Sequence, residues 1–278
     1  MTLDAHQHFW HYDPERHAWI DDSMAAIRRD FLPGDLEPQL SAHGIDGCVA
    51  VQADQTTAEN DFLLGLARDH AFIRGVVGWV DLADTSVEAQ LDRYAGEEKF
   101  VGVRHIVQAE GPGFLDRKDF RAGLKLLRNY GLTYDILIYH HQLQESSRLV
   151  TEFPDQPFVV DHIAKPVIAG QPDEEWVNHL RSLAGHENVY CKLSGMVTEV
   201  PTGDWTPQLL RPYVETVLEA FGPERVMYGS DWPVCLTVAD YASQLEALRY
   251  ACAELSADEQ AALFGGNAAG FYGLPASQ

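Results

Sequence analysis

Hydrophobic positions along the chain fall into short runs rich in β-branched residues, and a longer polar stretch with helical periodicity follows each run. This alternation is typical of βα units that build a parallel sheet. Eight such units in a chain of 278 residues predict a closed (β/α)8 TIM barrel rather than an open sheet. The eight runs are Leu3–His8, Gly47–Ala53, Ile73–Leu82, Phe100–Val107, Tyr134–Tyr139, Phe158–His162, Val189–Ser194 and Arg225–Ser230.

The stretches between these runs contain signals for helices. Residues Phe120–Arg128 place apolar side chains at helical spacing, and Gly131 follows where a left-handed residue would end the helix. Leu209–Phe221 presents one apolar face before a Gly-Pro stop. Ser256 begins a capping box, which predicts a final helix after the barrel. Since no linker-like segment interrupts the pattern, we expect residues 1–278 to form one α/β barrel domain.

The first connection between predicted strands is unusually long. It runs from Trp10 to Ile45, whereas a βα loop usually needs only a few residues, and it also contains Tyr12, His17 and Trp19. Long loops on the active face of a barrel often cover the site, but aromatic side chains also serve to pack such loops. The sequence leaves both roles open.

Composition narrows the possible partners. A hydrophobic content of 46% is ordinary for a globular protein with a large core. The net charge of −22 gives a surface that repels phosphates and anionic membranes, so we expect neither nucleic-acid nor membrane partners. The cysteines form no Cys-x-x-Cys pair, and the sequence contains neither a leader nor an apolar run long enough to span a bilayer. We therefore expect reduced thiols and a cytoplasmic location.

Two histidines in the first run suggest a metal site. His6 and His8 lie two positions apart, so their side chains project from the same face of a strand. Imidazole nitrogens bind zinc at about 2.0–2.1 Å, and two of them on one wall provide half of a site. This pattern alone fits two structural histidines equally well.

Polar residues at the other strand ends strengthen the prediction. In TIM barrels the chemistry lies at the C-terminal ends of the strands. Asp231 follows the eighth run and precedes Trp-Pro, which is a poor helix start, so a role in proton transfer is favoured over helix capping. Together the strand-end residues predict one active-site mouth. They are Gln52, Asp81, Arg104, His105, His140, His141, His162, Lys192, Asp231 and Trp232.

Four motifs, spanning Asp4–Trp10, Val159–Pro166, Val189–Gly195 and Tyr228–Pro233, extend this pattern over most of the chain. Together they resemble the amidohydrolase superfamily and, within it, the branch that hydrolyses sugar lactones such as L-fuconolactone and L-rhamnonolactone. Gly266–Ala269 continues the resemblance toward the end of the sequence.

The resemblance implies a role for each matching residue. His6 and His8 match the metal-binding pair of the first strand, His162 matches the sixth-strand histidine, and Asp231 matches the aspartate that ligates metal or acts as general base. The fourth predicted strand does not end in the lysine that bridges two metals in binuclear members. The resemblance therefore implies at most one divalent metal, zinc or another, and related lactonases work without a tightly held metal.

We accordingly expect an enzyme that opens a small neutral sugar lactone to the aldonic acid. Asp231 would take a proton from the attacking water and return it to the leaving alkoxide. The candidates for stabilising the oxyanion that forms on the carbonyl are His6, His8 and His162, with or without a metal, together with Lys192 or Arg104. The residues expected to bind the sugar are Gln52, Arg104, His105, His141 and Trp232.

Two alternatives remain. A metal-dependent decarboxylase or a dicarboxylate-lactone hydrolase of the same superfamily would need several arginines at the mouth, and only Arg104 is firmly placed there. A barrel that only binds metal or sugar would retain His6 and His8 but would have no need for Asp231.

Overall fold

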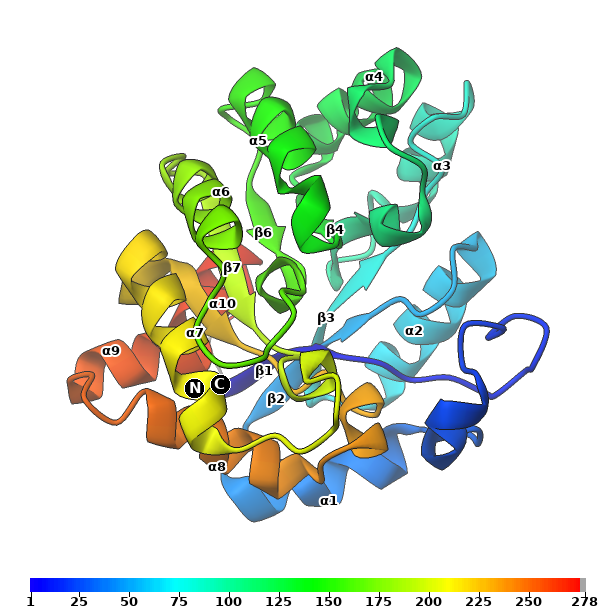
Figure 1. Ribbon diagram of the computed structural model, residues 1–278. Coiled ribbons are helices and arrows are strands. Elements are labelled where there is room, and N and C mark those ends of the chain that lie inside the picture. The colour runs from blue at the N-terminus through cyan, green and yellow to red at the C-terminus, as the bar shows by residue number, and fades with distance from the viewer. Residues whose placement is uncertain (276–278) are drawn as a thin grey trace.

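The computed structural model describes residues 1–275 and shows a barrel of eight parallel strands (Figure 1). Neighbouring strands pair in chain order, and each pair is parallel. The predicted TIM barrel is confirmed. The strands are β1 (Leu3–Gln7), β2 (Gly47–Val51), β3 (Ile73–Gly78), β4 (Phe100–His105), β5 (Thr133–Ile136), β6 (Phe158–Val160), β7 (Val189–Leu193) and β8 (Val226–Tyr228).

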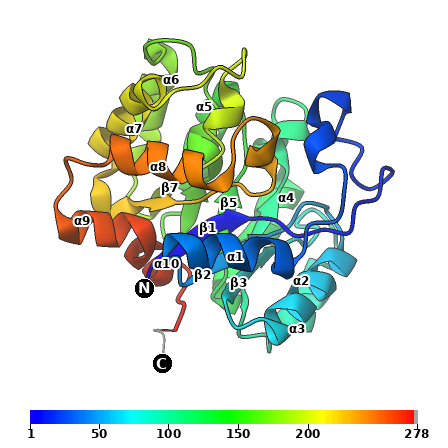
Figure 2. The same ribbon diagram turned by 90° about the horizontal axis from the view of Figure 1, so that it is seen from below.

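A helix follows each strand, and these helices surround the barrel (Figures 1 and 2). Within residues 1–275, no helix is both long enough and apolar enough to cross a membrane. The helices are α1 (Pro33–His43), α2 (Thr57–Asp69), α3 (Val87–Tyr94), α4 (Lys118–Leu127), α5 (Leu143–Glu152), α6 (Glu174–Ala184), α7 (Pro207–Phe221), α8 (Tyr241–Ala251), α9 (Ala257–Ala261) and α10 (Asn267–Phe271).

The helix signals in the sequence mark real helices. The predicted helix 120–128 corresponds to α4 and the 3-10 turn after it, and Gly131 ends this segment with a φ of 68°. The second predicted helix corresponds to α7, which begins two positions earlier because Thr206 caps it. The capping box at Ser256 is present, and it begins α9.

The strands are shorter than their hydrophobic runs at the C-terminal ends. The run 73–82, for example, continues beyond the end of β3 at Gly78. Val80 and Leu82 remain 0% and 1% exposed, because the loop that follows β3 folds back into the core. Hydrophobicity therefore marks burial here, whereas strand pairing ends where the chain leaves the sheet.

The barrel closes between its first and last strands. Gln7 pairs with Trp232 in a parallel bridge, and the backbone N–H of His8 donates to the carbonyl of Trp232 at 2.7 Å. The N–H of Asp231 donates to the carbonyl of His6 at 2.8 Å. These bonds fix Asp231 directly beside the two histidines of β1.

A buried carboxylate reinforces this closure. Asp4 accepts hydrogen bonds from the N–H of Ser230 at 2.8 Å and from the hydroxyl of Tyr241 at 3.1 Å. Burial raises the pKa of Asp4 to about 6, although these donors oppose the shift. One side chain thus ties β1 to the end of β8 and to α8.

The C-terminal segment packs against the N-terminal ends of the strands, and α10 lies beside the start of β1 (Figure 2). Ala268, Tyr272 and Leu274 pack into the same apolar cluster as Leu3 and Val49 inside the barrel. This C-terminal segment covers the N-terminal ends of the strands. The active site is therefore expected at the opposite end, where the strands have their C-terminal ends.

Gly229 should be required for the close approach of β8 to β1. A Cβ added at Gly229 would lie 2.6 Å from the Cβ of His6 and 3.1 Å from that of Ser194. We expect Gly229→Ala to lower the free energy of unfolding by about 1–3 kcal/mol, the usual cost of overpacking. Gly65→Ala in α2 is the matched control, because nothing lies within 4 Å of its added Cβ. Urea unfolding should separate the two variants, and equal stability would contradict this role for Gly229.

Candidate active site

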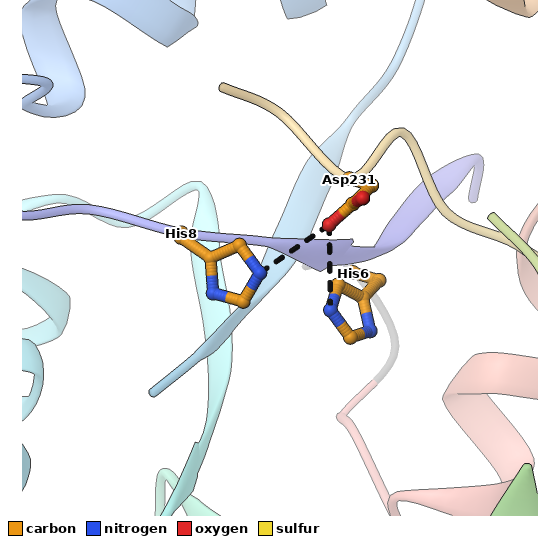
Figure 3. Close-up of side chains that lie close together, drawn as sticks. All are labelled: His6, His8 and Asp231. Carbon is orange, nitrogen blue, oxygen red and sulfur yellow. Dashed lines mark ion pairs between the residues drawn. The ribbon is translucent and has the colours of Figure 1, made fainter. Parts of the chain in front are cut away.

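Three histidines and an aspartate converge at the C-terminal end of the barrel. His6 lies in β1 and His8 just beyond it, and Asp231 follows β8 (Figure 3). His162 follows β6. The Nε2 atoms of His8, His6 and His162 lie 3.4, 3.8 and 3.8 Å from Oδ1 of Asp231. The fold thus gathers three imidazoles around one carboxylate oxygen.

Hydrogen bonds on the opposite ring nitrogens orient these imidazoles. Nδ1 of His8 lies 2.7 Å from the carbonyl of Val51 and must donate to it, so Nε2 keeps its lone pair. Nδ1 of His162 lies 2.8 Å from the hydroxyl of Ser194. Contacts of this kind hold metal-binding histidines in a fixed tautomer and orientation.

The backbone is strained where it positions these groups. Asp231 has a φ of 56°, and the turn from His162 to Lys165 has φ values of 53°, 50°, 61° and 48°. Left-handed conformations at residues other than glycine cost about 1–3 kcal/mol each and cluster at functional sites. Because the barrel maintains this turn, it places both His162 and Lys165 at the mouth.

Burial sets the protonation of the cluster. It lowers the pKa of His162 to about 4 and that of His6 well below its usual value, so both rings are neutral near pH 7. Burial would raise the pKa of Asp231, but His162, His8 and His6 together lower it below its usual value. An ionised carboxylate therefore faces the neutral rings of His6 and His162.

A buried ionic layer lies next to this cluster. Nζ of Lys192 lies 2.6 Å from Oδ2 of Asp135 and 3.0 Å from Oδ1 of Asp161. Arg104 contacts the second oxygen of Asp161 at 3.2 Å, and the hydroxyl of Tyr272 donates to Asp135 at 2.8 Å. All four ionic side chains are at most 3% exposed, so the layer is shielded from water.

This layer supports the orientation of His6. Nδ1 of His6 lies 3.3 Å from Asp161 and 3.2 Å from Nζ of Lys192. Burial would raise the pKa of Asp161, but Lys192, His6 and Arg104 lower it well below its usual value. Burial raises the pKa of Asp135 to about 6, against the effect of Lys192. Asp161 is therefore the anion that faces the ring of His6.

A pocket of about 760 Å³ opens above the cluster. Its floor includes His8, His162, Arg104 and Asp231. This volume lies in the range of about 300–1,000 Å³ found for small-molecule sites. The pocket can therefore hold a small ligand directly against Asp231.

The long first loop takes part in both structure and pocket. Phe31 of this loop packs against Trp232, which follows β8, with ring centroids 5.2 Å apart, and Trp10 is 1% exposed. Trp19, Ser23 and Met24 from the same loop line the pocket. The loop is therefore packed onto the barrel and also forms one wall of the site.

Several residues expected at the site lie behind its walls. Gln52 is fully buried, and its Nε2 donates to the carbonyl of Arg104 at 3.1 Å. Trp232 is 2% exposed and packs between Phe9 and Phe31. These side chains support the loops that carry the site, whereas Arg104 reaches the pocket itself.

Two expected histidines lie farther away. His105 follows Arg104 in β4, so it projects from the opposite face of the strand. Its Nε2 lies 2.8 Å from Glu110, and its ring stacks on Phe114. His141 is exposed and stacks on Tyr139. The structure brings neither imidazole to the cluster around Asp231.

Other residues near the site had weaker signals in the sequence. Asp135 interrupts the apolar run of β5, and Asp161 directly follows the apolar run of β6, so both were detectable as charges beside buried strand residues. Lys165 and Glu199 line the pocket from loops. Tyr272 had no local signal, because only the tertiary fold brings it to Asp135.

The donor set fits one divalent metal. Ligand atoms of His6, His8 and Asp231 lie within 4.8 Å of one another. Two ligands of a tetrahedral zinc with bonds of about 2.0–2.2 Å are roughly 3.4 Å apart, close to the separations around Asp231. A second possible group, His6, Asp161 and His162, shares His6 with the first. The geometry therefore suits one ion better than two.

A (β/α)8 barrel that gathers histidines and an aspartate in a pocket at its strand ends has the architecture of an enzyme whose active site can hold a metal. The model of the amidohydrolase family matches residues 3–274. The chain belongs to the amidohydrolase family.

Similar proteins cover the whole chain. L-fucono-1,5-lactonase of Burkholderia multivorans is 38% identical over 292 aligned residues, which cover 99% of this chain and 97% of that protein. L-fucono-1,5-lactonase of Burkholderia ambifaria is 37% identical over 279 residues, with coverage of 98% and 95%. The crystal structure of an amidohydrolase from Burkholderia multivorans with bound zinc has a TM-score of 0.94 at 37% identity, and covers 99% of this chain and 100% of that chain.

Proposed function

We propose that this protein hydrolyses a small neutral sugar lactone to the aldonic acid, with L-fucono-1,5-lactone as the first candidate substrate. The observation that carries the proposal is Asp231 on the wall of a pocket of about 760 Å³, with Nε2 atoms of His8, His6 and His162 within 3.4–3.8 Å of its Oδ1. The full-length similarity to two L-fucono-1,5-lactonases supports the choice of lactone.

Asp231 acts as general base and then as general acid in this proposal. It takes a proton from a water whose oxygen attacks the lactone carbonyl, and a carbon–oxygen bond forms. The ring carbon–oxygen bond then breaks, and Asp231 returns the proton to the alkoxide oxygen. The product is the open hydroxy acid, and Asp231 is ionised again.

The oxyanion on the carbonyl needs positive or hydrogen-bonding partners. Arg104 and His162 both line the pocket, so they are the candidates. Lys192 is fully buried beside Asp135 and Asp161. We assign it the role of positioning His6 through Asp161 rather than touching the substrate.

A divalent metal would be held by His6, His8 and Asp231, with His162 alongside. Such a metal supplies Lewis-acid stabilisation of the developing negative charge. Arg104 lies 3.3 Å from Nε2 of His6, so its positive charge would compete with a cation at that nitrogen.

We expect at most one tightly bound divalent metal per chain. The reason is that both candidate ligand groups share His6, and Arg104 approaches the same ring. Elemental analysis of the purified protein after dialysis against zinc measures the ratio. A ratio near two would contradict the expectation, and a His6→Asn variant should bind less metal than the wild type.

The substrate class can be tested with a pH-indicator assay over a panel of lactones. The charged residues on the pocket wall are two cations, Arg104 and Lys165, and two carboxylates, Glu199 and Asp231, which suits an uncharged ligand. We expect turnover of neutral aldonolactones above their spontaneous rate, and little turnover of a dicarboxylated lactone. Activity restricted to the dicarboxylated lactone, or absent throughout, would reject the proposal.

A further inference from the structure

A lysine and a glutamate face each other on the pocket wall without touching. Lys165 ends the strained turn after β6, and Glu199 ends the 3-10 turn Val197–Glu199 after β7. Nζ of Lys165 and Oε1 of Glu199 are 3.8 Å apart, and both side chains are 18% exposed. Both line the pocket that contains Asp231.

This separation leaves hydrogen-bonding capacity free. A direct hydrogen bond between such groups would be about 2.7–3.2 Å long, so the ion pair is loose. The ammonium has three donors, and the carboxylate can accept several hydrogen bonds. Partly buried charges that are not tightly paired are costly unless further partners satisfy them. A polar ligand in the pocket would be such a partner.

The backbone and the charge balance agree with a ligand-binding role. The left-handed turn that ends at Lys165 is conformationally costly, and strain of this kind persists where it positions a functional group. Burial raises the pKa of Glu199 despite the nearby ammonium, which is consistent with a pocket of limited hydration.

Apolar side chains also line this pocket. Trp19, Tyr139 and Val238 line the same pocket, and Nζ of Lys165 lies 5.7 Å from the centroid of the Tyr139 ring. A sugar ring presents both hydroxyl groups and an apolar face of C–H groups. A loose pair of opposite charges beside aromatic surface matches both features.

We propose that Lys165 and Glu199 form a specificity pair that binds two neighbouring hydroxyl groups of the substrate ring. Glu199 accepts a hydrogen bond from one hydroxyl, and Lys165 donates to the oxygen of the next. The ligand class is an uncharged polyhydroxylated lactone. This inference rests on the proposed function and adds to it the residues that select the substrate.

The test combines protein variants with substrate analogues. Lys165→Met and Glu199→Gln are assayed on a fully hydroxylated aldonolactone and on analogues that each lack one ring hydroxyl. Hydrogen bonds to charged groups contribute about 10- to 150-fold, so each variant should lower kcat/KM for the full substrate by roughly that factor. The loss should fall mainly on KM, because the contact forms already in the bound substrate.

The pattern across analogues decides the result. On the analogue that lacks the hydroxyl bound by the substituted residue, the variant and the wild type should have nearly the same kcat/KM. On the other analogues, the variant should have a lower kcat/KM than the wild type by the full factor. Equal losses on all analogues, or a loss only in kcat, would overturn the proposal in favour of a structural role. Lys125→Met and Glu98→Gln, which change exposed residues outside the pocket, are the matched controls and should behave as the wild type.

Failure of the proposed function can be distinguished experimentally from failure of the specificity pair. If the wild type opens none of the lactones, the lactonase assignment fails by itself. The pair is then tested by the thermal shift that the same lactones and their aldonic acids produce. Stabilisation of the wild type that is lost in both variants, but kept in the two controls, would support the pair as a sugar-binding element. Unchanged stabilisation in the variants would reject it.

Discussion

Asp231→Asn should lower kcat about 10²- to 10⁴-fold, the usual contribution of general acid–base catalysis. The substitution removes the ionised oxygen around which three imidazoles converge. Asparagine is similar in size and is one of the few residues that tolerate the φ of 56° found here. The fold should therefore survive, as circular dichroism and urea unfolding would verify.

Asp81→Asn is the matched control, because Asp81 is a half-buried aspartate that follows β3 and does not line the active-site pocket. It should retain nearly full activity. A folded Asp231→Asn protein that keeps more than about a tenth of wild-type turnover would show that another group is the base. Activity that returns with excess zinc would assign the loss to metal ligation and would also contradict the proton-transfer role.

Lys192→Met should destabilise the protein by about 3–5 kcal/mol, the usual cost of leaving a buried ion without its partner. Asp135 and Asp161 would both lose their contacts with the ammonium, at 2.6 and 3.0 Å. Methionine fills a similar volume, so the loss should reflect charge rather than a cavity. Urea unfolding measures the change.

The double variant Lys192→Met/Asp135→Asn isolates the charge effect. Asp135→Asn removes one of the two carboxylates that lose their cation in Lys192→Met, so it should recover part of the lost stability. The effects of the two substitutions on the free energy of unfolding should therefore not be additive. Lys125→Met, at an exposed position in α4, should change stability by less than about 0.5 kcal/mol. A loss below about 1 kcal/mol for Lys192→Met would mean that the buried ion pairs are dispensable.

The fold could be predicted because each βα unit carries its own local signal. Buried parallel strands are continuous apolar runs, and the amphipathic helices and caps between them are visible over a few residues. The strand ends could not be placed in the same way. Val80 and Leu82 are as buried as a strand residue, although they lie in a loop, so hydrophobicity alone did not distinguish them.

The candidate site could be predicted only in part. His6, His8, His162 and Asp231 lie at strand ends, where position along the chain fixes position at the mouth. His105 follows Arg104 in β4. Successive side chains of a strand project to opposite faces, so these two side chains point in opposite directions. The contact of Tyr272 with Asp135 joins residues 137 positions apart, and no local pattern encodes it.

We expect the closure between β1 and β8 to be a late step in the synthesis and folding of this chain. Asp4 and Ser230 are 226 residues apart, and the hydrogen bond between them lies beside the junction of His6 with Asp231. Contacts of such long range form late and slowly in folding. A nascent chain on the ribosome has His6 and His8 almost from the start but lacks their carboxylate until β8 has emerged. If Asp231 is the catalytic base, recovery of activity during refolding should therefore report the final closing of the barrel, and a chain that lacks β8 should be inactive.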